Sequence, residues 1–276
     1  MNGPASDAQS RNRLWMGAPL VTALTEAAIV IVGCGGNGAL VAIGLAHLGV
    51  RRLTLCDPDR IETSNLNRSP AAAPGDVGRL KVDVLCDYLR PRFPRLELAA
   101  VSEPSPNDPV AAACTSGTAV FGCLDTVHAR LELDVLCRSR GRLLIDAGSG
   151  FATDDGGAIV SGGGQVLISR PGGPCLQCLG FTPTVGGPGY FVPGDAHPAA
   201  SSLLLNSVVS ALALECLLDE LGRGRRGVNR VSYDANARTL IAQTLVGQRA
   251  CPVCGTGSAA HLAGVGDWRP QPSGGG

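Results

Sequence analysis

The sequence has no net charge, since 23 Lys and Arg residues balance 23 Asp and Glu residues over 276 positions. A neutral chain creates no long-range basic field, so nothing in its charge favours nucleic acid or an anionic membrane as a partner. Long apolar runs are also missing, and helical stretches are interrupted well before the roughly 20 residues that cross a bilayer. The polar residues 1–12 lack the apolar core of a signal peptide. These absences predict a cytoplasmic protein without nucleic-acid or membrane partners.

Disulfide bonds are a second feature that we do not expect, even though the chain contains 11 cysteines. Disulfide frameworks are typical of secreted chains much shorter than this one, and an odd number of cysteines cannot pair completely. The cysteines therefore indicate a reducing compartment. The length is sufficient for one large α/β domain with an ample core.

Segments typical of strands and of helices alternate along the first half of the chain. Short apolar runs indicate strands, and longer runs with helical periodicity indicate helices. We expect strands at residues 29–32, 51–56, 96–101, 118–122 and 143–146, and helices at residues 39–48, 78–89, 108–114 and 126–138. This alternation predicts an α/β fold with a Rossmann-like, mostly parallel sheet and right-handed crossovers.

The pattern changes after Gly148. Residues 156–169 alternate in character and are rich in glycine, which predicts an added antiparallel hairpin, and a long apolar helix is expected at residues 199–221. Strands at residues 230–233 and 239–244 predict a second hairpin. The expected organisation is a single domain with flexible ends: a disordered N-terminus at 1–12, a domain at 13–256 with a first part at 27–148 and a second, hairpin-containing part at 149–256, and a flexible tail at 257–276.

The first strand ends at a glycine-rich turn, Gly33-x-Gly35-Gly36-x-Gly38, and a helix follows directly. Glycines let the backbone approach a ligand closely, and the free N–H groups at the start of a helix favour a phosphate. Asp57 ends the second strand, where its carboxylate can accept hydrogen bonds from a ribose diol. An NAD-dependent oxidoreductase would share the turn and the acid, and Asp57 alone could also be a turn residue or a helix cap.

Three charged residues distinguish nucleotidyl transfer from redox chemistry. Arg68 and Lys81 follow the second strand, and Asp125 follows the fourth. Each of them alone would be an ordinary surface charge, but at the carboxyl ends of neighbouring strands they form a set. Cations neutralise the charge that develops on phosphates, and a carboxylate holds Mg²⁺. A redox enzyme does not need this set beside its pyrophosphate, so we favour phosphoryl or nucleotidyl transfer.

Four cysteines form two Cys-x-x-Cys pairs far apart in the sequence, Cys175 with Cys178 and Cys251 with Cys254. Two such pairs are typical of a closed tetrahedral zinc site. All four ligands come from the protein, so no open position remains for catalysis, and the zinc would fasten the hairpin region to the C-terminal part. Disulfide pairing is the alternative, and a reducing compartment disfavours it.

Together these motifs resemble the ubiquitin-activating-enzyme-like adenylyltransferases of the ThiF/MoeB/HesA group. The resemblance extends from about residue 11 to residue 254. Besides the glycine turn and the cysteine pairs, it includes Asp57-x-Asp59, Ser64-Asn-Leu-Asn-Arg68, Asp76-x-Gly78 before Lys81, and Leu124-Asp125.

The resemblance implies a role for each matching residue. Gly35 and Gly36 would lie under the nucleotide, within the turn formed with Gly33 and Gly38, and Asp57 would bind the ribose with Asp59 among the cofactor-binding residues. The residues implied to contact the phosphates of ATP are Asn65, Arg68 and Lys81. Asp125 would hold Mg²⁺. Arg13, or less directly Arg11, resembles an arginine that reaches into the site of a partner subunit, which implies a homodimer.

The implied reaction is the ATP-dependent adenylation of a C-terminal carboxylate with release of pyrophosphate. By resemblance, the carboxylate belongs first of all to the C-terminal glycine of a ubiquitin-like or sulfur-carrier protein. A small ribosomal peptide or a tRNA-linked carboxylate is an alternative substrate. Alternatives from other classes are an NAD-dependent oxidoreductase and a non-catalytic nucleotide-binding partner subunit.

Members of this group that form a thioester resemble one another in carrying a cysteine between the first Cys-x-x-Cys pair and the long helix. Residues 179–202 of this chain contain none. We therefore expect the reaction on this chain to stop at the acyl-adenylate.

Overall fold

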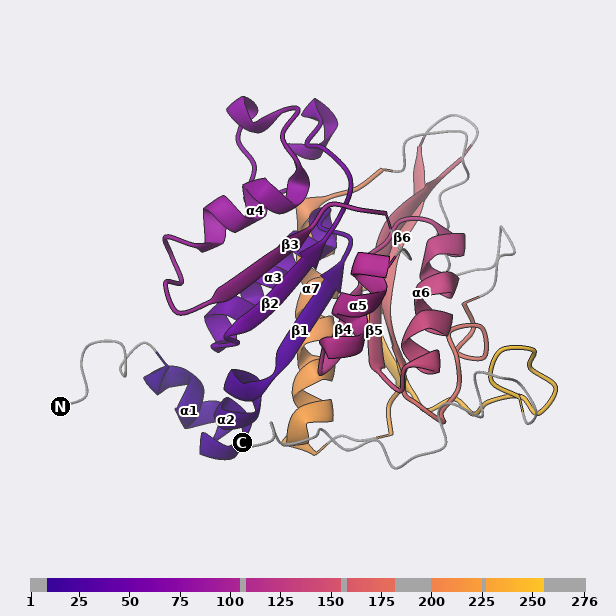
Figure 1. Cartoon of the computed structure of the whole chain (residues 1–276). Helices are drawn as coiled ribbons and strands as arrows, with labels where there is room; N and C mark the ends of the chain where they lie inside the picture. Colours follow the sequence, from indigo (N-terminus) through magenta and orange to yellow (C-terminus); the bar gives the residue numbers. More distant parts are fainter. Residues whose placement is uncertain (1–8, 105–107, 155–157, 182–199, 225–226, 256–276) are drawn as a thin grey trace.

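One eight-stranded sheet forms the centre of the fold, with its strands in the order β3-β2-β1-β4-β5-β6-β7-β8 (Figure 1). The computed structural model describes residues 9–104, 108–154, 158–181, 200–224 and 227–255. The strands are β1 (Ala28–Val32), β2 (Arg52–Cys56), β3 (Glu97–Val101), β4 (Ala119–Gly122), β5 (Leu143–Thr153), β6 (Ile159–Ser169), β7 (Arg230–Asp234) and β8 (Thr239–Gln243).

The five strands from β3 to β5 are parallel, as the alternation of strands and helices predicts. Their ends are aligned: Val32 of β1 is opposite Cys56 of β2 and Gly122 of β4, and Gly122 is opposite Asp146 of β5. The loops that follow β1, β2 and β4 therefore meet at one edge of the sheet. This edge is where open α/β sheets bind ligands.

The antiparallel part of the sheet differs from the expectation in one respect. β5 does not end at Asp146 but continues to Thr153, and it pairs with β6 from Leu144 to Thr153, with one irregularity between Ala152 and Thr153. The expected hairpin within residues 156–169 is thus a single strand. The apolar signal of β5 ends early because Gly148, which has no side chain, follows where Arg130 lies close to the strand: a Cβ there would lie 2.7 Å from Nη1 of Arg130. On β6, a Cβ at Gly164 would lie 2.3 Å from Cγ2 of Val209 of α7. The second expected hairpin is formed by β7 and β8.

Helices cover both faces of the sheet. The helices are α1 (Ser10–Met16), α2 (Ala18–Glu26), α3 (Gly36–Leu48), α4 (Lys81–Leu89), α5 (Asp108–Ser116), α6 (Val127–Ser139) and α7 (Leu203–Leu218). Buried side chains of α2, α3, α4 and α7 form the larger core with one face, and those of α5 and α6 form a second core with the other. In Figure 1, α5 and α6 lie in front of the strands and α7 lies behind them.

The ends of the chain were expected to be disordered or flexible. Residues 10–12 instead belong to α1, whereas residues 1–8 and the tail at 257–276 lie outside the described residues. Within the part of the chain that the structure describes, no helix has the length and apolar character needed to cross a membrane.

Candidate nucleotide site and four-cysteine cluster

The glycine turn connects β1 to α3 at the edge where the parallel strands end. Gly33 has a φ of 92°, and a Cβ there would lie 2.5 Å from the carbonyl oxygen of Cys123. A Cβ at Gly38 would lie 1.8 Å from the carbonyl oxygen of Gly33, whereas a Cβ at Gly35 would meet nothing within 4 Å. α3 begins at Gly36 without a side-chain cap. The turn thus presents open space and the free N–H groups of a helix start, which suits a phosphate.

Asp57 joins the glycine turn to the end of β2. Its side chain is 5% exposed. Oδ2 accepts a hydrogen bond from the N–H of Cys34 at 2.6 Å, and Oδ1 accepts one from the N–H of Asp59 at 2.8 Å. Burial raises the pKa of Asp57, while Lys81 and these two hydrogen bonds act in the opposite direction. A carboxylate oxygen can accept more than one hydrogen bond, so Asp57 can hold the turn and still bind a ribose hydroxyl.

Lys81 begins α4, and its ammonium group lies among carboxylates. Its Nζ is 2.7 Å from Oδ2 of Asp59, and its side chain is 15% exposed. Burial lowers the pKa of Lys81, but the negative charges of Asp57, Asp59 and Asp125 outweigh this effect and raise it. The structure therefore brings together charged residues from three separate segments of the chain, as the sequence predicts.

Asp125 lies in the short loop between β4 and α6 and is exposed. The next residue, Thr126, caps α6, because its hydroxyl oxygen accepts a hydrogen bond from the N–H of Ala129 at 3.3 Å. Mg²⁺ is commonly bound by one or two carboxylates, with waters and substrate phosphates as its other ligands. The accessible carboxylate of Asp125 fits that kind of site.

Asn65 and Arg68 belong to the loop between β2 and α4. The side-chain oxygen of Asn65 accepts a hydrogen bond from the N–H of Glu62 at 3.1 Å and so stabilises the loop itself. The guanidinium of Arg68 donates to oxygens of its own loop. The carbonyl oxygen of Arg68 lies 3.5 Å from the position of a Cβ at Gly36. The backbone of this loop thus borders the glycine turn, while the guanidinium of Arg68 binds within its own loop.

Arg13 lies at the other end of α3 from the glycine turn. α1 packs on the last turn of α3, where Nδ2 of Asn12 donates to the carbonyl oxygen of His47 at 2.9 Å. A helix of 13 residues places Arg13 about 20 Å from the turn of its own chain. The structure does not bring Arg13 together with the other site residues of its own chain. If Arg13 acts at a nucleotide site, that site must belong to another subunit.

The structure places a cluster of polar side chains beside the glycine turn that the sequence motifs did not predict. The hydroxyl of Ser149 donates to Oδ1 of Asn206 at 2.7 Å and accepts from Nδ2 of Asn37 at 3.0 Å. Asn206 is 3% exposed, and its amide nitrogen would lie 2.1 Å from a Cβ at Gly36. The signal for it in the sequence is a buried asparagine within a helix that otherwise reads as apolar core.

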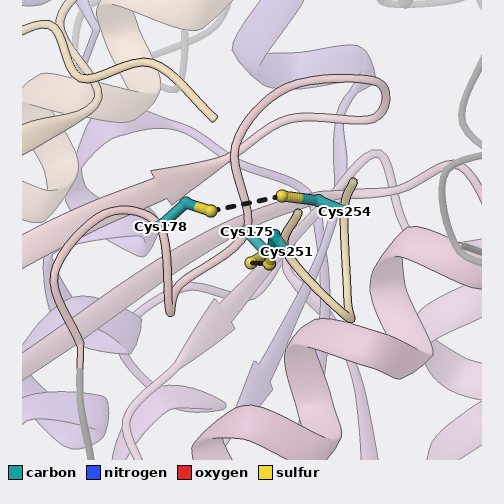
Figure 2. Close-up of side chains that lie close together, drawn as sticks. All are labelled: Cys175, Cys178, Cys251 and Cys254. Carbon is teal, nitrogen blue, oxygen red and sulfur yellow. Dashed lines mark hydrogen bonds between the residues drawn. The ribbon is translucent and has the colours of Figure 1, made fainter. Parts of the chain in front are cut away.

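The four cysteines of the two Cys-x-x-Cys pairs come together as the sequence predicts, and Figure 2 shows them facing one another. Their four sulfur atoms all lie within 4.8 Å of one another. Sγ of Cys175 is 3.6 Å from that of Cys251, and Sγ of Cys178 is 3.5 Å from that of Cys254. Four thiolates bound to zinc at about 2.3 Å are separated by about 3.8 Å. The donor set and its spacing therefore fit a tetrahedral zinc ion.

The four-cysteine cluster lies near the opposite edge of the sheet from the glycine turn. β6 runs antiparallel to β5 and ends at Ser169, beside Leu144 at the start of β5. The first pair of cysteines follows within ten residues of that point. The cluster is therefore separate from the nucleotide site and fits a structural role.

Comparison with known proteins agrees with this arrangement. The sequence profile of the ThiF family matches residues 9–217. The SAMP-activating enzyme E1 of Haloferax volcanii is 30% identical over 245 residues, 88% of this chain and 85% of that protein. The molybdopterin-synthase adenylyltransferase of Salmonella typhimurium is 28% identical over 235 residues, 84% of this chain and 89% of that protein.

Solved structures resemble the fold as well. The crystal structure of Escherichia coli MccB superposes with a TM-score of 0.74 at 20% identity, covering 94% of this chain and 75% of that one. The expected α/β fold and the expected resemblance to adenylyltransferases are confirmed. The chain belongs to the ThiF family.

Proposed function

We propose that this chain uses MgATP to adenylate the C-terminal carboxylate of a ubiquitin-like or sulfur-carrier protein. An oxygen of the carboxylate attacks the α-phosphorus of ATP, the bond from that phosphorus to the bridging oxygen of the β-phosphate breaks, and pyrophosphate leaves. The carboxylate is ionised at neutral pH, so the step needs no general base. The observation that carries the proposal is the convergence of Lys81, Asp57 and Asp125 on the edge that holds the uncapped glycine turn.

The site residues have distinct proposed tasks. Asp57 binds the ribose, and the N–H groups at the start of α3 bind a phosphate. Asn65, Arg68 and Lys81 neutralise and orient the β- and γ-phosphates, for which the guanidinium of Arg68 must leave the oxygens of its own loop. Asp125 would hold Mg²⁺, which supplies charge neutralisation at the phosphates when bound. Catalysis then consists mainly of positioning and electrostatic stabilisation.

The relatives support this choice of substrate. They include a sulfur carrier protein ThiS adenylyltransferase and a SAMP-activating enzyme. A small ribosomal peptide is the second candidate, favoured by the structural resemblance to MccB, which has been crystallised with ATP and with N-formylated MccA.

The proposed assembly is a homodimer in the cytoplasm with zinc in the four-cysteine cluster. The position of Arg13 supports a dimer. This exposed residue lies about 20 Å from the glycine turn of its own chain, so only a second subunit can bring it to a nucleotide site. None of the 11 cysteines, all of which lie in the described residues, forms a disulfide bond, which supports a reducing compartment.

Exchange of labelled pyrophosphate into ATP tests the proposal. We expect exchange that depends on a protein or peptide with a free C-terminal carboxylate, and its loss in Asp125→Ala with the fold retained. Asp83→Asn, which changes an exposed acid on α4, is the control and should keep full activity. Calorimetry should show binding of MgATP but not of NAD. Binding of NAD alone, or full exchange in Asp125→Ala, would contradict the proposal.

A further inference from the structure

One buried carboxylate, that of Asp146, lies next to the residues on both sides of the loop that carries Asp125. Asp146 of β5 is fully buried and is paired in register with Gly122, the last residue of β4. The same carboxylate binds the guanidinium of Arg130: Nε donates to Oδ1 at 3.1 Å and to Oδ2 at 3.0 Å, and Nη2 also donates to Oδ2. Arg130 follows Asp125 by five residues. Asp146 therefore lies beside Gly122, the residue before the loop, and binds Arg130, which lies in the first turn of α6 after the loop.

The surroundings leave this ion pair little freedom. Arg130 is 6% exposed. A Cβ at Gly122 would lie 3.0 Å from Oδ1 of Asp146, and a Cβ at Gly148 would lie 2.7 Å from Nη1 of Arg130. Both charged groups thus fill space that glycines leave empty. A buried pair of this kind gains little stability over an apolar pair of the same volume, but it fixes the direction of both side chains.

Arg130 is the first of three buried charged residues spaced four apart on α6, followed by Asp134 and Arg138. We call these three residues the charged face of α6. Oδ2 of Asp134 accepts a hydrogen bond from the N–H of Leu176 at 2.8 Å, and Leu176 lies between the ligands Cys175 and Cys178. Nη1 of Arg138 donates to the carbonyl oxygen of Arg170 at 3.3 Å. The charged face therefore contacts the segment that carries the first pair of cysteines.

Residues 176–181 connect the cluster back to Arg130. Leu176 and Leu179 are fully buried in the core shared with α6. The ring of Phe181 is 1% exposed, and its centroid is 4.1 Å from Cζ of Arg130. α6 and this segment thus span the sheet from the four-cysteine cluster at one edge to Asp125 at the other.

We propose that Arg130 and Asp134 are positioning residues that couple the four-cysteine cluster to Asp125. The ion pair of Arg130 with Asp146 holds the loop so that the carboxylate of Asp125 faces the nucleotide site. Asp134 fixes α6 to the cysteine segment, so metal in the cluster sets the position of the helix. This proposal rests on the proposed function, since it requires Asp125 to hold Mg²⁺ at that site.

The first test removes the ion pair without leaving an unpaired buried charge. The double variant Arg130→Met/Asp146→Asn should fold, because removing both charges avoids the penalty of breaking the pair. We expect the Mg²⁺ concentration for half-maximal pyrophosphate exchange to rise at least about tenfold, the size of effect known for residues that orient metal ligands. Arg130→Lys, which keeps the charge but loses the bidentate contact, should shift it in the same direction. The matched control is Glu132→Gln, which changes a partly exposed acid that contacts His128 one turn earlier, outside the charged face of α6.

The second test addresses the coupling to the cluster. Asp134→Asn keeps the shape of the side chain but weakens its contact with Leu176. We expect zinc transfer to a chelator to become about tenfold faster or more and the Mg²⁺ requirement to rise with it. The assay requires that the wild-type protein exchanges pyrophosphate into ATP. A wild-type protein without this activity would contradict the proposed function and not the coupling. The coupling would be overturned if folded variants had an unchanged Mg²⁺ requirement and their exchange rate followed only the folded fraction. That result would leave the proposed function intact.

Discussion

The ammonium nitrogen of Lys81 lies 2.7 Å from Oδ2 of Asp59, so a cation assigned to ATP phosphates already has a carboxylate partner in the protein alone. Asp59 is exposed, with a side-chain exposure of 62%, whereas Lys81 is mostly covered. The pair holds Lys81 at the edge of the site, charged and oriented. Phosphate oxygens carry more charge than one carboxylate and can take over the contact when ATP binds.

Removal of this cation should reduce the adenylation step. Lys81→Ala should lower the rate of pyrophosphate exchange by about a hundredfold or more, the usual effect of losing one electrostatic stabiliser. The control is Arg79→Ala, two residues away, which removes a cation that pairs with the surface acids Asp76 and Asp87. Equal losses in the two variants would mean that Lys81 acts only through general surface charge.

The four-cysteine cluster should hold one zinc ion per chain. Cys251→Ser should release the metal and lower the melting temperature, because zinc binding at such a site contributes directly to folding free energy. The control is Cys216→Ala, which removes a buried thiol of α7 outside the cluster and should retain zinc. Metal analysis by mass spectrometry checks both, and full zinc content in Cys251→Ser would refute the site.

Arg13 should act at the site of a partner subunit. Arg13→Ala and Asp125→Ala should each be inactive as homodimers. When the two are mixed and exchange subunits, half of the dimers contain both chains, and each of these has one intact site. The recovered exchange activity should therefore approach about a quarter of the wild-type value. No recovery, with subunit exchange verified by native mass spectrometry, would assign Arg13 to another task.

The reaction on this chain should end at the acyl-adenylate. Residues 179–202 contain no cysteine, although most of that range lies outside the described residues. Burial raises the pKa of Cys216 to about 12, and burial together with Asp57 raises that of Cys34. Burial and Asp146 also raise the pKa of Cys123. These thiols therefore remain protonated and poorly nucleophilic at neutral pH.

Incubation with MgATP and the carboxylate partner should yield an adenylate that hydroxylamine traps. A non-reducing gel should show no adduct that a thiol reagent releases. An adduct that disappears in Cys34→Ser or Cys123→Ser would show that a covalent step occurs at that residue instead.

Local sequence determined the elements that carry the site and the residues within them. The glycine turn, Asp57, Lys81 and the two Cys-x-x-Cys pairs are each set by a short motif, because a tight turn, a strand end or a metal knuckle needs particular residues at fixed spacing. The same local reasoning ended β5 at Asp146, because the glycines that follow have no side chains to continue an apolar pattern. Only main-chain pairing with β6 extends that strand.

Long-range contacts determined how these elements act together. No local pattern shows that Asp146 binds Arg130, that Asn206 of α7 packs against Gly36, or that Asp59 holds Lys81, since each contact joins segments 16 to 170 residues apart. The role proposed for the exposed Arg13 comes from the family resemblance, but its distance from the glycine turn of its own chain follows only from the packing of α1 on the far end of α3. The sequence by itself therefore predicted which chemical groups belong to the candidate site. The tertiary structure decided their partners and their separations, because burial and register are properties of the folded sheet and not of any one segment.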